Sequence, residues 1–458
     1  MAKTPGNPKR SKRSPRSELA ALPFPGLARQ VLTDLAASRC ASVFGLSNTG
    51  KSTFMRGLAT QPAATAYEAI RGRPGSLVYV DCNRAVAISV QAFYEVMLRS
   101  ILEGLKGSAS AAMMESLTAY HAAITEADNE FAASLAFNRA LTDLCESLGR
   151  DLCLLIDEFD EIYVSLEDRA LLNMRALRDR FPDRLLYVTA TVRRLPNLRG
   201  RVVEDEFAEM FSRSTYRMPA LREDVVAKIL AELEAPGLDE EVEGEVKLLA
   251  GGHPGLLIAI GQVLATPGAV DAAEVLARVA KEPQPKAECL KIWNQLSDDE
   301  RTWLTSLVLN EDAGLPSPQT SHLESLGILS SGVPFSPLFA QFVARRMRAP
   351  EVGDKGIYVD HDSGDVWVEG TRIPMLTDLE FRLMALLDDR RDKLTDKYMI
   401  VTEVWGEEYL GDVDDARVEK LVSRLRGKIE QDPANPRFLV TQRGRGYKLL
   451  TNPLKSIA

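Results

Sequence analysis

Four short, continuous apolar runs constrain the fold of this 458-residue chain more than any other feature. They span residues 41–44, 77–80, 152–156 and 185–189, and longer stretches of helical character separate them. Strands that are buried on both faces of a parallel sheet have such continuous aliphatic runs, whereas half-exposed strands alternate. Strands that alternate with helices predict a doubly wound α/β domain with a parallel sheet.

The sequence GLSNTGKS at residues 45–52 follows the first run and opens a helical segment. It matches G-x-x-x-x-G-K-[ST], in which glycines let the backbone curl so that N–H groups point at phosphate oxygens. The following helix adds the positive end of its dipole. We therefore expect ATP or ADP here, with Lys51 on the β- and γ-phosphates and Ser52 on Mg²⁺; a glycine-rich turn that matches by chance is the alternative. The residues predicted to bind the nucleotide are Gly45, Ser47, Asn48, Thr49, Gly50, Lys51, Ser52 and Thr53.

Two acidic residues end the third apolar run, in the sequence LCLLIDE at residues 152–158. Carboxylates at the carboxyl end of a parallel strand lie beside the crevice where α/β sheets bind ligands. Asp157 is predicted to hold Mg²⁺, and Glu158 to polarise an attacking water, so that Lys51 and Glu158 are the predicted catalytic residues. A solvated acidic turn is the alternative, because Asp160 and Glu161 continue the acidic run.

Two weaker signals follow. The fourth apolar run ends among polar and cationic residues that could sense a γ-phosphate or could simply be solvated; they are Thr189, Thr191, Arg193 and Arg194. His253 lies in the sequence GGHP within a helical region. It is predicted to be a helix-boundary residue without a chemical role.

The order of the motifs GLSNTGKST, LLIDE, VTATVRR and GGHPGLL resembles that of STAND-class ATPases and their origin-recognition relatives in the AAA+ assemblage. The resemblance covers about residues 20–350 and implies that Gly252 and Pro254 lie near the adenine. A winged helix follows the core in that family, and the stretch LESLGILSSGVPFSPLFAQF resembles it; PFPGLARQ loosely resembles the family's N-terminal adenine-side motif. Unlike that family, the chain shows no repeat array, and no arginine can be named as a trans-acting finger.

A second informative stretch spans residues 416–430. Its apolar residues recur at helical spacing on one face, and Arg417, Lys420, Arg424 and Lys428 form a basic stripe beside that face. A helix that packs on one side and is cationic on the other can lie in a DNA major groove, although a solvated surface helix is the alternative. Residues 438–450 predict a hairpin with Arg443-Gly-Arg-Gly at its tip, suited to a phosphate or the minor groove.

The sequence VDDARVEKLVSRLRGKIEQDP followed by RFLVTQRGRGYKLL resembles the effector domain of OmpR-type response regulators. The resemblance covers about residues 356–450 and implies binding of double-stranded DNA by a recognition helix and a wing. No receiver domain precedes this module, because the ATPase occupies that place. The acidic loop at residues 403–415 suits contact with RNA polymerase or a weakening of non-specific DNA binding. The DNA contacts that position implies are Arg417, Lys420, Ser423, Arg424, Arg426, Thr441, Arg443 and Arg445.

The predicted organisation is therefore α/β, with a doubly wound parallel-sheet P-loop NTPase followed by helical and winged-helix parts. The predicted segments are a disordered basic tail (1–20), the P-loop ATPase core (21–219), a helical lid (220–285), a winged-helix-like unit (286–350) and an OmpR-type winged-helix DNA-binding domain (356–458).

Composition and charge exclude several other classes. A hydrophobic content of 45% and a charged content of 26% exclude global disorder and a collagen-like fibre. No apolar run reaches the ~18 residues of a membrane helix. The five cysteines show no CxxC spacing, so a reducing compartment fits best, and we expect a cytoplasmic, nucleoid-associated protein.

The net charge of −9 is unevenly distributed. Residues 1–17 hold six bases and no acid, and residues 417–448 hold nine bases against three acids. A polyanion is therefore expected to meet the basic ends rather than the acidic body. For the N-terminal tail, a disordered solubility segment and non-specific nucleic-acid contact both stay open.

Together these features predict an ATP-binding, nucleotide-switched DNA-binding protein, most simply a transcriptional regulator. Two alternatives stay open: a DNA-associated AAA+/STAND ATPase in DNA loading, remodelling or defence, and a non-hydrolysing, ADP-bound DNA-binding scaffold. The lack of a nameable arginine finger favours slow hydrolysis of ATP to ADP. The operator, the input signal and homo-oligomer formation stay open.

Overall fold

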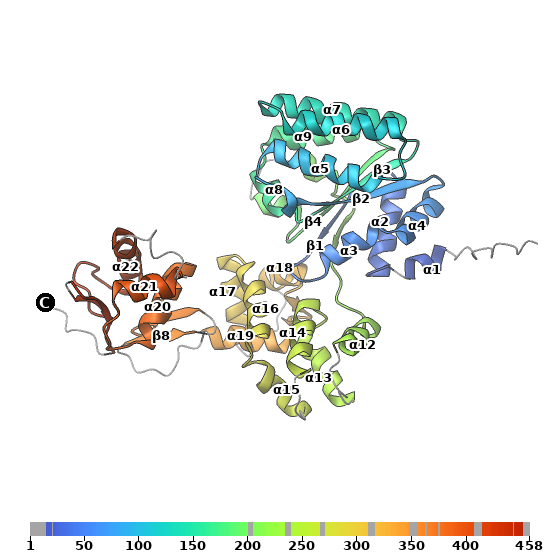
Figure 1. Cartoon of the computed structure of the whole chain (residues 1–458). Helices are drawn as coiled ribbons and strands as arrows, with labels where there is room; N and C mark the ends of the chain where they lie inside the picture. The colour runs from blue at the N-terminus through green and yellow to red at the C-terminus, as the bar shows by residue number, and fades with distance from the viewer. Residues whose placement is uncertain are drawn as a thin grey trace, which may run out of the picture. The chain divides into compact units, whose positions relative to one another are not determined.

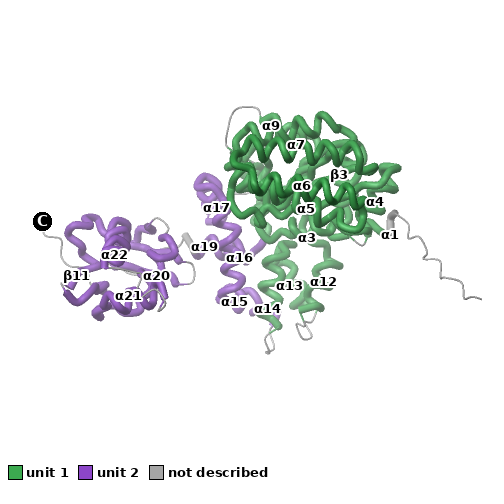
Figure 2. Tube along the Cα trace, turned by 45° about the horizontal axis from the view of Figure 1, so that its top comes forward, with its two compact units in different colours: residues 1–267, 316–335 green, residues 268–315, 336–458 purple. Residues whose placement is uncertain are grey.

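A computed structural model of the chain (Figure 1) describes residues 15–20, 22–199, 205–233, 240–265, 271–309, 317–347, 356–361, 364–373, 376–406, 415–442 and 444–451. The chain divides into two compact units, residues 1–267 with 316–335 and residues 268–315 with 336–458 (Figure 2). The sequence predicted a finer division into five segments, and those boundaries remain predictions. Most of the predicted basic tail lies outside the described residues.

The first unit is built on a five-stranded parallel sheet with the strand order β2-β3-β4-β1-β5. All four apolar runs are strands in it, and every residue of β1, β3 and β4 is buried, which explains their continuous aliphatic character. The parallel α/β fold predicted from the sequence is confirmed. The strands are β1 (Ala41–Phe44), β2 (Gly75–Asp81), β3 (Asp151–Asp157), β4 (Leu185–Thr191) and β5 (Thr215–Arg217).

Helices cover both faces of this sheet (Figure 1). Right-handed crossovers place the helices between β1 and β2 on one face. The later crossovers run across the sheet in the opposite direction and therefore cover the other face. The first face holds α1 (Pro15–Ala20), α2 (Pro25–Ala36), α3 (Lys51–Leu58) and α4 (Gln61–Arg71). The second face holds α5 (Val90–Leu105), α6 (Ala111–Thr125), α7 (Glu130–Ser147), α8 (Asp160–Ser165), α9 (Asp168–Arg180), α10 (Leu195–Arg199) and α11 (Glu206–Glu209).

The same unit contains lid helices and a short hairpin. The helices of the predicted lid segment (220–285) that lie in this unit are α12 (Glu223–Glu232), α13 (Glu240–Ala250) and α14 (Pro254–Leu264), whereas α15 (Ala272–Val279) belongs to the second unit. Helix α18 (Pro318–Leu326) leads into the antiparallel strands β6 (Leu329–Ser330) and β7 (Val333–Pro334). Arg217, at the end of β5, donates a hydrogen bond to the carbonyl of Glu324 at 2.8 Å, which ties this distant segment to the sheet.

The second unit begins with helices and ends in a winged-helix domain. A three-stranded antiparallel sheet, three helices and a closing hairpin follow one another from residue 357, as the sequence predicted. The helices are α15 (Ala272–Val279), α16 (Pro283–Asn294), α17 (Asp298–Leu309), α19 (Pro337–Met347), α20 (Asp378–Asp389), α21 (Lys397–Val404) and α22 (Asp415–Ile429). The strands are β8 (Ile357–Asp360), β9 (Asp365–Val368), β10 (Thr371–Arg372), β11 (Leu439–Gln442) and β12 (Gly446–Leu449).

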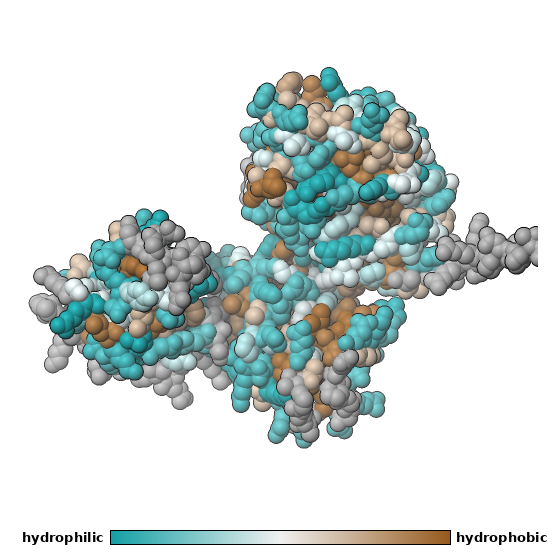
Figure 3. Space-filling model, viewed as in Figure 1, coloured by the Kyte–Doolittle hydropathy of each residue, from teal (hydrophilic) through white to brown (hydrophobic). Residues whose placement is uncertain are grey.

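No helix in the described parts of the chain combines the length and the apolar character that crossing a bilayer requires. The visible face of the molecule mixes hydrophilic and apolar residues (Figure 3). All five cysteines are buried free thiols. The cysteines thus contribute to packing.

Candidate nucleotide and nucleic-acid sites

The phosphate loop lies between β1 and α3, the context that the motif requires. Two of its residues have left-handed backbone conformations, Asn48 at φ 59° and Gly50 at φ 92°. A Cβ atom at Gly50 would also lie 3.0 Å from the ring of Phe24. Glycine is therefore required at position 50 both for its φ and for space.

Lys51 begins α3 and is 5% exposed. Its Nζ donates to the carbonyl oxygens of Gly45, at 2.7 Å, and Leu46, at 3.0 Å. Burial lowers the pKa of Lys51, and the carboxylates that follow β3 oppose that shift. A buried ammonium group inside the loop is a strong attractor for an anion such as phosphate.

The acidic end of β3 lies beside this loop, as predicted. Asp157 is fully buried; its Oδ2 accepts a hydrogen bond from the Tyr79 hydroxyl at 2.8 Å, and its Oδ1 has no hydrogen-bond partner. Ser52 Oγ donates to Glu158 Oε1 at 3.4 Å. The carboxylate pair and the Ser52 hydroxyl therefore meet at the start of α3.

These oxygens fit a magnesium ion. Mg²⁺ prefers oxygen ligands and usually takes one or two carboxylates together with water and substrate phosphates. The unpaired, buried Oδ1 of Asp157 is such a ligand, and Ser52 offers a second oxygen. Across the described residues, no group of three or more His, Cys, Asp or Glu side chains is placed to hold a metal ion by itself. A bound nucleotide would therefore complete the coordination.

Asp160 is not fully solvated, as it would be if residues 157–161 formed only a solvated acidic turn. Its Oδ1 accepts a hydrogen bond from the backbone N–H of Val192 at 2.8 Å, and its Oδ2 is buried without a partner. Burial raises the pKa of Asp160. The hydrogen bond from Val192 joins the start of α8, which follows β3, to the residue after β4.

The raised pKa of Glu158 predicts how the stability of the folded protein depends on pH. Burial raises this pKa, and the neighbouring Asp157 adds to the shift. The folded protein thus holds the Glu158 proton more tightly than the unfolded chain does, so stability is lost as the pH rises through the raised folded-state pKa. We expect Glu158→Gln to raise the melting temperature of the nucleotide-free protein at pH 7.5. This gain should shrink towards zero below about pH 4, where the unfolded carboxyl is also protonated.

Thermal unfolding across this pH range checks the Glu158 prediction. Glu161→Gln, which removes a charge from the exposed side of α8, is the matched control. A stability difference for Glu158→Gln that did not change with pH would contradict the assignment.

The polar residues at the end of β4 are partly used inside the protein. Thr189 Oγ1 donates to Ser42 Oγ at 3.0 Å, and Thr191 Oγ1 donates to the carbonyl of Arg193 at 2.6 Å. The Arg194 guanidinium lies 5.3 Å from the centroid of the Phe44 ring. It therefore stays a prediction that a side chain at this strand end senses a γ-phosphate, and the prediction applies best to Arg193 and Arg194.

His253 contacts the phosphate loop, which the sequence analysis did not foresee. Its Nε2 lies 3.0 Å from the carbonyl oxygen of Ser47, and the N–H of Gly255 donates to the Asn48 carbonyl at 3.1 Å. Pro254 lies against the same loop, with its Cγ 3.8 Å from a Cβ built on Gly50. The sequence marks a helix start at this position but cannot show which segment the histidine meets.

A cavity of about 510 Å³ opens beside the loop, within the size range of ligand pockets. The loop, the end of β5, the lid and the β6–β7 hairpin each contribute to its wall. The lining includes Gly45, Thr49, Met218, Gly252, Pro254 and Phe335. Three of the predicted nucleotide residues, Gly45, Thr49 and Pro254, thus border a concave space, as a nucleotide site requires.

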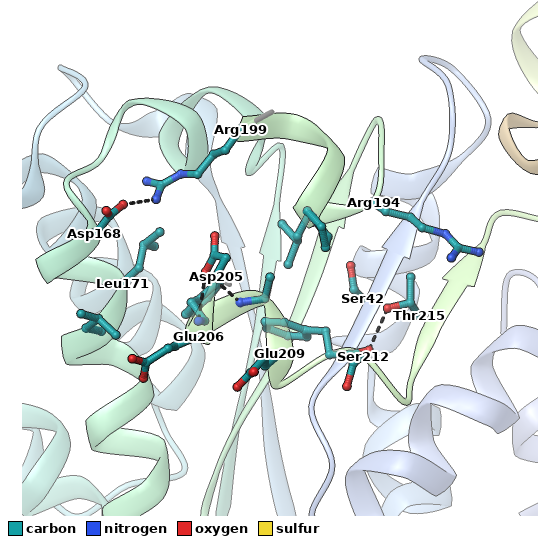
Figure 4. Close-up of a pocket in the computed structure, with 16 residues that line it drawn as sticks. Ser42, Asp168, Leu171, Arg194, Arg199, Asp205, Glu206, Glu209, Ser212 and Thr215 are labelled. Carbon is teal, nitrogen blue, oxygen red and sulfur yellow. Dashed lines mark hydrogen bonds and ion pairs between the residues drawn. The ribbon is translucent and has the colours of Figure 1, made fainter. Parts of the chain in front are cut away.

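A second cavity, of about 600 Å³, lies on the face of the sheet opposite α3 (Figure 4). Its polar groups largely bond to one another. Arg199 pairs with Asp168, and Asp205 caps α11 by accepting from the N–H of Phe207 at 3.0 Å. Figure 4 shows Arg194 directed away from these groups. The cavity beside the phosphate loop is therefore the better candidate for a nucleotide site.

Helix α22 has the two faces that the sequence predicted. Its Val, Leu and Ile residues are all buried in the core of the C-terminal domain, while Arg417, Lys420, Ser423 and Arg424 are exposed. Lys428, the last member of the basic stripe, forms an ion pair with Glu380 at 2.7 Å. The exposed positive charge of the helix therefore lies towards its first three turns.

Arg426 connects α22 to the closing hairpin. Its guanidinium donates to the Leu439 carbonyl and to Thr441 Oγ1, each at 2.7 Å, and burial lowers its pKa. Two predicted DNA contacts, Arg426 and Thr441, are thus bonded to each other. Arg445 is exposed on the hairpin, and Arg443 lies outside the described residues.

Glu430 is a structural residue that the sequence analysis missed. It is 8% exposed and follows the last residue of α22. Its carboxylate accepts hydrogen bonds from the backbone N–H groups of Arg437, Phe438 and Leu439, each at 2.8 Å. This one side chain therefore fixes the start of the hairpin against the end of α22.

Comparison with known proteins supports the C-terminal assignment. Residues 371–449 match the family described as "Transcriptional regulatory protein, C terminal". The uncharacterized transcriptional regulatory protein YrkP of Bacillus subtilis (strain 168) is 37% identical over 97 residues, which are 21% of this chain and 41% of that protein. This chain therefore spans less than half the length of that relative. The match confirms the OmpR-type resemblance for this part of the chain.

The rest of the chain has solved structural neighbours of low identity. The Walker-type ATPase PABY2304 of Pyrococcus abyssi aligns with a TM-score of 0.47 at 16% identity, over 69% of this chain and 94% of that one. The Aeropyrum pernix ORC2 protein aligns with a TM-score of 0.42 at 16% identity, over 73% and 95% respectively. Both TM-scores lie below 0.5, so the fold assignment rests on the sheet order and the phosphate loop. The chain is thus an α/β protein with a phosphate-loop motif between β1 and α3, and its residues 371–449 match the family of transcriptional regulatory protein C-terminal domains.

Proposed function

We propose that this chain binds ATP and Mg²⁺ at residues 45–52 and that the nucleotide state controls DNA binding by its C-terminal domain. In this proposal the protein is a transcriptional regulator in which a nucleotide site replaces a receiver domain. The observation that carries the proposal is the presence, in one chain, of a phosphate loop beside an unpaired Asp157 oxygen and a winged-helix domain with a cationic helix.

Each part of the loop has a defined task in nucleotide binding. Backbone N–H groups at the start of α3 bind phosphate oxygens, and Lys51 adds a positive charge. Ser52 and Asp157 would hold Mg²⁺, which neutralises phosphate charge when it is bound. Glu158 is oriented by the Ser52 hydroxyl, and its raised pKa makes it a stronger base than an exposed glutamate. These residues suit slow hydrolysis of ATP.

The C-terminal domain is proposed to bind double-stranded DNA through α22. The exposed side chains of Arg417, Lys420 and Arg424 would face the major groove, while the buried face holds the helix on its domain. The bonds from Arg426 to the hairpin keep the helix and wing in one geometry. Helix and wing would therefore bind DNA as one rigid surface.

The nucleotide switch is tested by DNA affinity under three conditions. The full-length protein is titrated with DNA in the presence of a non-hydrolysable ATP analogue, of ADP and of no nucleotide, at one salt concentration because affinity depends steeply on salt. The proposal expects different affinities in the three conditions. Identical affinities, with nucleotide binding demonstrated separately, would refute the switch and leave two independent binding activities.

Arg424→Ala is expected to weaken specific DNA binding by about 1–3 kcal/mol, because an arginine on an exposed recognition helix can bond a base edge with two hydrogen bonds. The measurement is the ratio of affinities for a selected site and for random DNA. Arg382→Ala, which removes the same charge from α20, is the matched control. An equal loss on random DNA would reassign Arg424 to a phosphate contact.

Two further partners are part of this proposal. The acidic loop at residues 403–415 would contact RNA polymerase; residues 407–414 lie outside the described part of the chain. A second copy of the chain would bind when two half-sites are adjacent on DNA. A regulator of this kind would work in the cytoplasm at the nucleoid.

A further inference from the structure

We propose that His253 is the positioning residue that fixes the phosphate loop to lid helix α14 and to the β6–β7 hairpin. This inference rests on the proposed nucleotide binding and describes how the nucleotide state would be transmitted from the phosphate loop to the β6–β7 hairpin. Hydrogen bonds join the phosphate loop to the start of α14, among them one from His253 Nε2 to the Ser47 carbonyl at 3.0 Å and one from the Gly255 N–H to the Asn48 carbonyl at 3.1 Å. These two loop carbonyls are thus held by the lid.

The hydrogen bonds of His253 determine its tautomer. Its Nδ1 lies 3.2 Å from the N–H of Leu256, as the N-cap of α14, and must therefore be the acceptor. The ring proton is then on Nε2, which can donate to the Ser47 carbonyl. The neutral ring thus serves two segments at once, because each nitrogen has its own partner.

The segment around His253 packs closely against the segments next to it. A Cβ atom at Gly251 would overlap the carbonyl oxygen of Phe335, and one at Gly252 would lie 2.6 Å from the Cβ of Ala220. The His253 ring also packs on the Phe335 ring, with centroids 6.0 Å apart. The lid segment therefore lies wedged between the end of β5 and the hairpin.

Phe335 lies where a movement of the phosphate loop would reach it through His253. Its N–H donates to the Ile328 carbonyl at 3.0 Å and closes the β6–β7 hairpin. The chain passes directly from Phe335 to Ser336, where the sequence of the second unit resumes. A shift of the Ser47–Asn48 backbone must move His253, and a shift of His253 must move Phe335. The hairpin thereby senses the nucleotide.

Two substitutions of His253 separate this role from simple helix capping. Asn keeps an N-cap acceptor but is too short to reach the Ser47 carbonyl, whereas Gln can place an amide N–H near Nε2 but caps helices poorly. We expect His253→Asn to weaken ADP binding about tenfold, the effect of one lost hydrogen bond to the partly buried Ser47 carbonyl. We expect His253→Gln to stay within about threefold of the wild type. If capping alone mattered, the order would be reversed.

The experiment uses the full-length protein, ADP titration and hydrogen exchange. In the wild type and in His253→Gln, ADP should protect the Phe335 amide; in His253→Asn this protection should be lost while the Leu256 amide stays protected. His121→Asn is the matched control, since His121 lies on α6 and its Nε2 bonds to Glu95 of α5 at 2.8 Å, outside the proposed nucleotide site. If His253→Asn bound ADP as tightly as the wild type does, this inference would be overturned but the proposed function would stand. A wild-type protein that binds no ADP would overturn the proposed function as well.

Discussion

Replacing Lys51 by alanine is expected to weaken the binding of ATP and ADP at least 100-fold. The Lys51 ammonium is buried inside the loop and is the positive side chain of the motif. Hydrogen bonds to charged groups contribute about 1.5–3 kcal/mol each, so the loss of two phosphate contacts corresponds to this factor or more. Calorimetric or fluorescence titration of the purified variant measures the change.

The matched control for this prediction is Lys106→Ala, at the exposed C-terminal end of α5. DNA binding by Lys51→Ala without nucleotide should equal that of the wild type, because the C-terminal domain does not contain the substitution. The burial that lowers the pKa of Lys51 also means that its removal relieves a desolvation cost, so the fold should persist. Tight nucleotide binding by Lys51→Ala would refute the site.

Replacing Glu430 by alanine is expected to destabilise the C-terminal domain by about 3 kcal/mol or more. Three backbone N–H groups donate to this carboxylate at 2.8 Å each, and an unsatisfied buried donor costs about 1–3 kcal/mol. Hydrogen exchange of the β11–β12 amides and denaturant unfolding measure the loss. Because the hairpin would no longer be held against α22, specific DNA binding should also fall.

Two variants test the origin of that effect. Glu430→Gln keeps one acceptor oxygen and should lie between the wild type and the alanine variant. Glu403→Ala removes a carboxylate from the exposed side of α21 and should cost little. A small effect of Glu430→Ala would show that water replaces the carboxylate.

Much of the fold could be predicted because the signals are local. Strands β1 to β4 follow from continuous apolar runs, since both faces of the sheet are covered by helices. The fifth strand, β5, was missed because its sequence, Thr-Tyr-Arg, is short and only half-buried at the sheet edge. An edge strand of this kind lacks the apolar signal that buried strands carry.

The candidate sites were predictable in part for the same reason. The glycines and Lys51 act within one loop, so a short sequence window contains the whole phosphate-binding arrangement. Arg426 shows what a short sequence window does not contain: the family resemblance placed it among the DNA contacts by its position, and the structure bonds it to Leu439 and Thr441 of the hairpin. His253 shows the converse, because a residue that looked like a simple helix boundary contacts the phosphate loop.

The sequence by itself determined the strands β1 to β4 and the helical stretches between them, the phosphate loop with its acidic partners, and the two faces of α22. Such features depend on backbone conformation and burial periodicity, which neighbouring residues encode. Only the tertiary structure decided that Tyr79 bonds Asp157, that His253 holds the loop, and that Glu430 anchors the hairpin. These bonds join side chains to groups on other elements, and the geometry that brings such groups within about 3 Å arises only when the elements have packed.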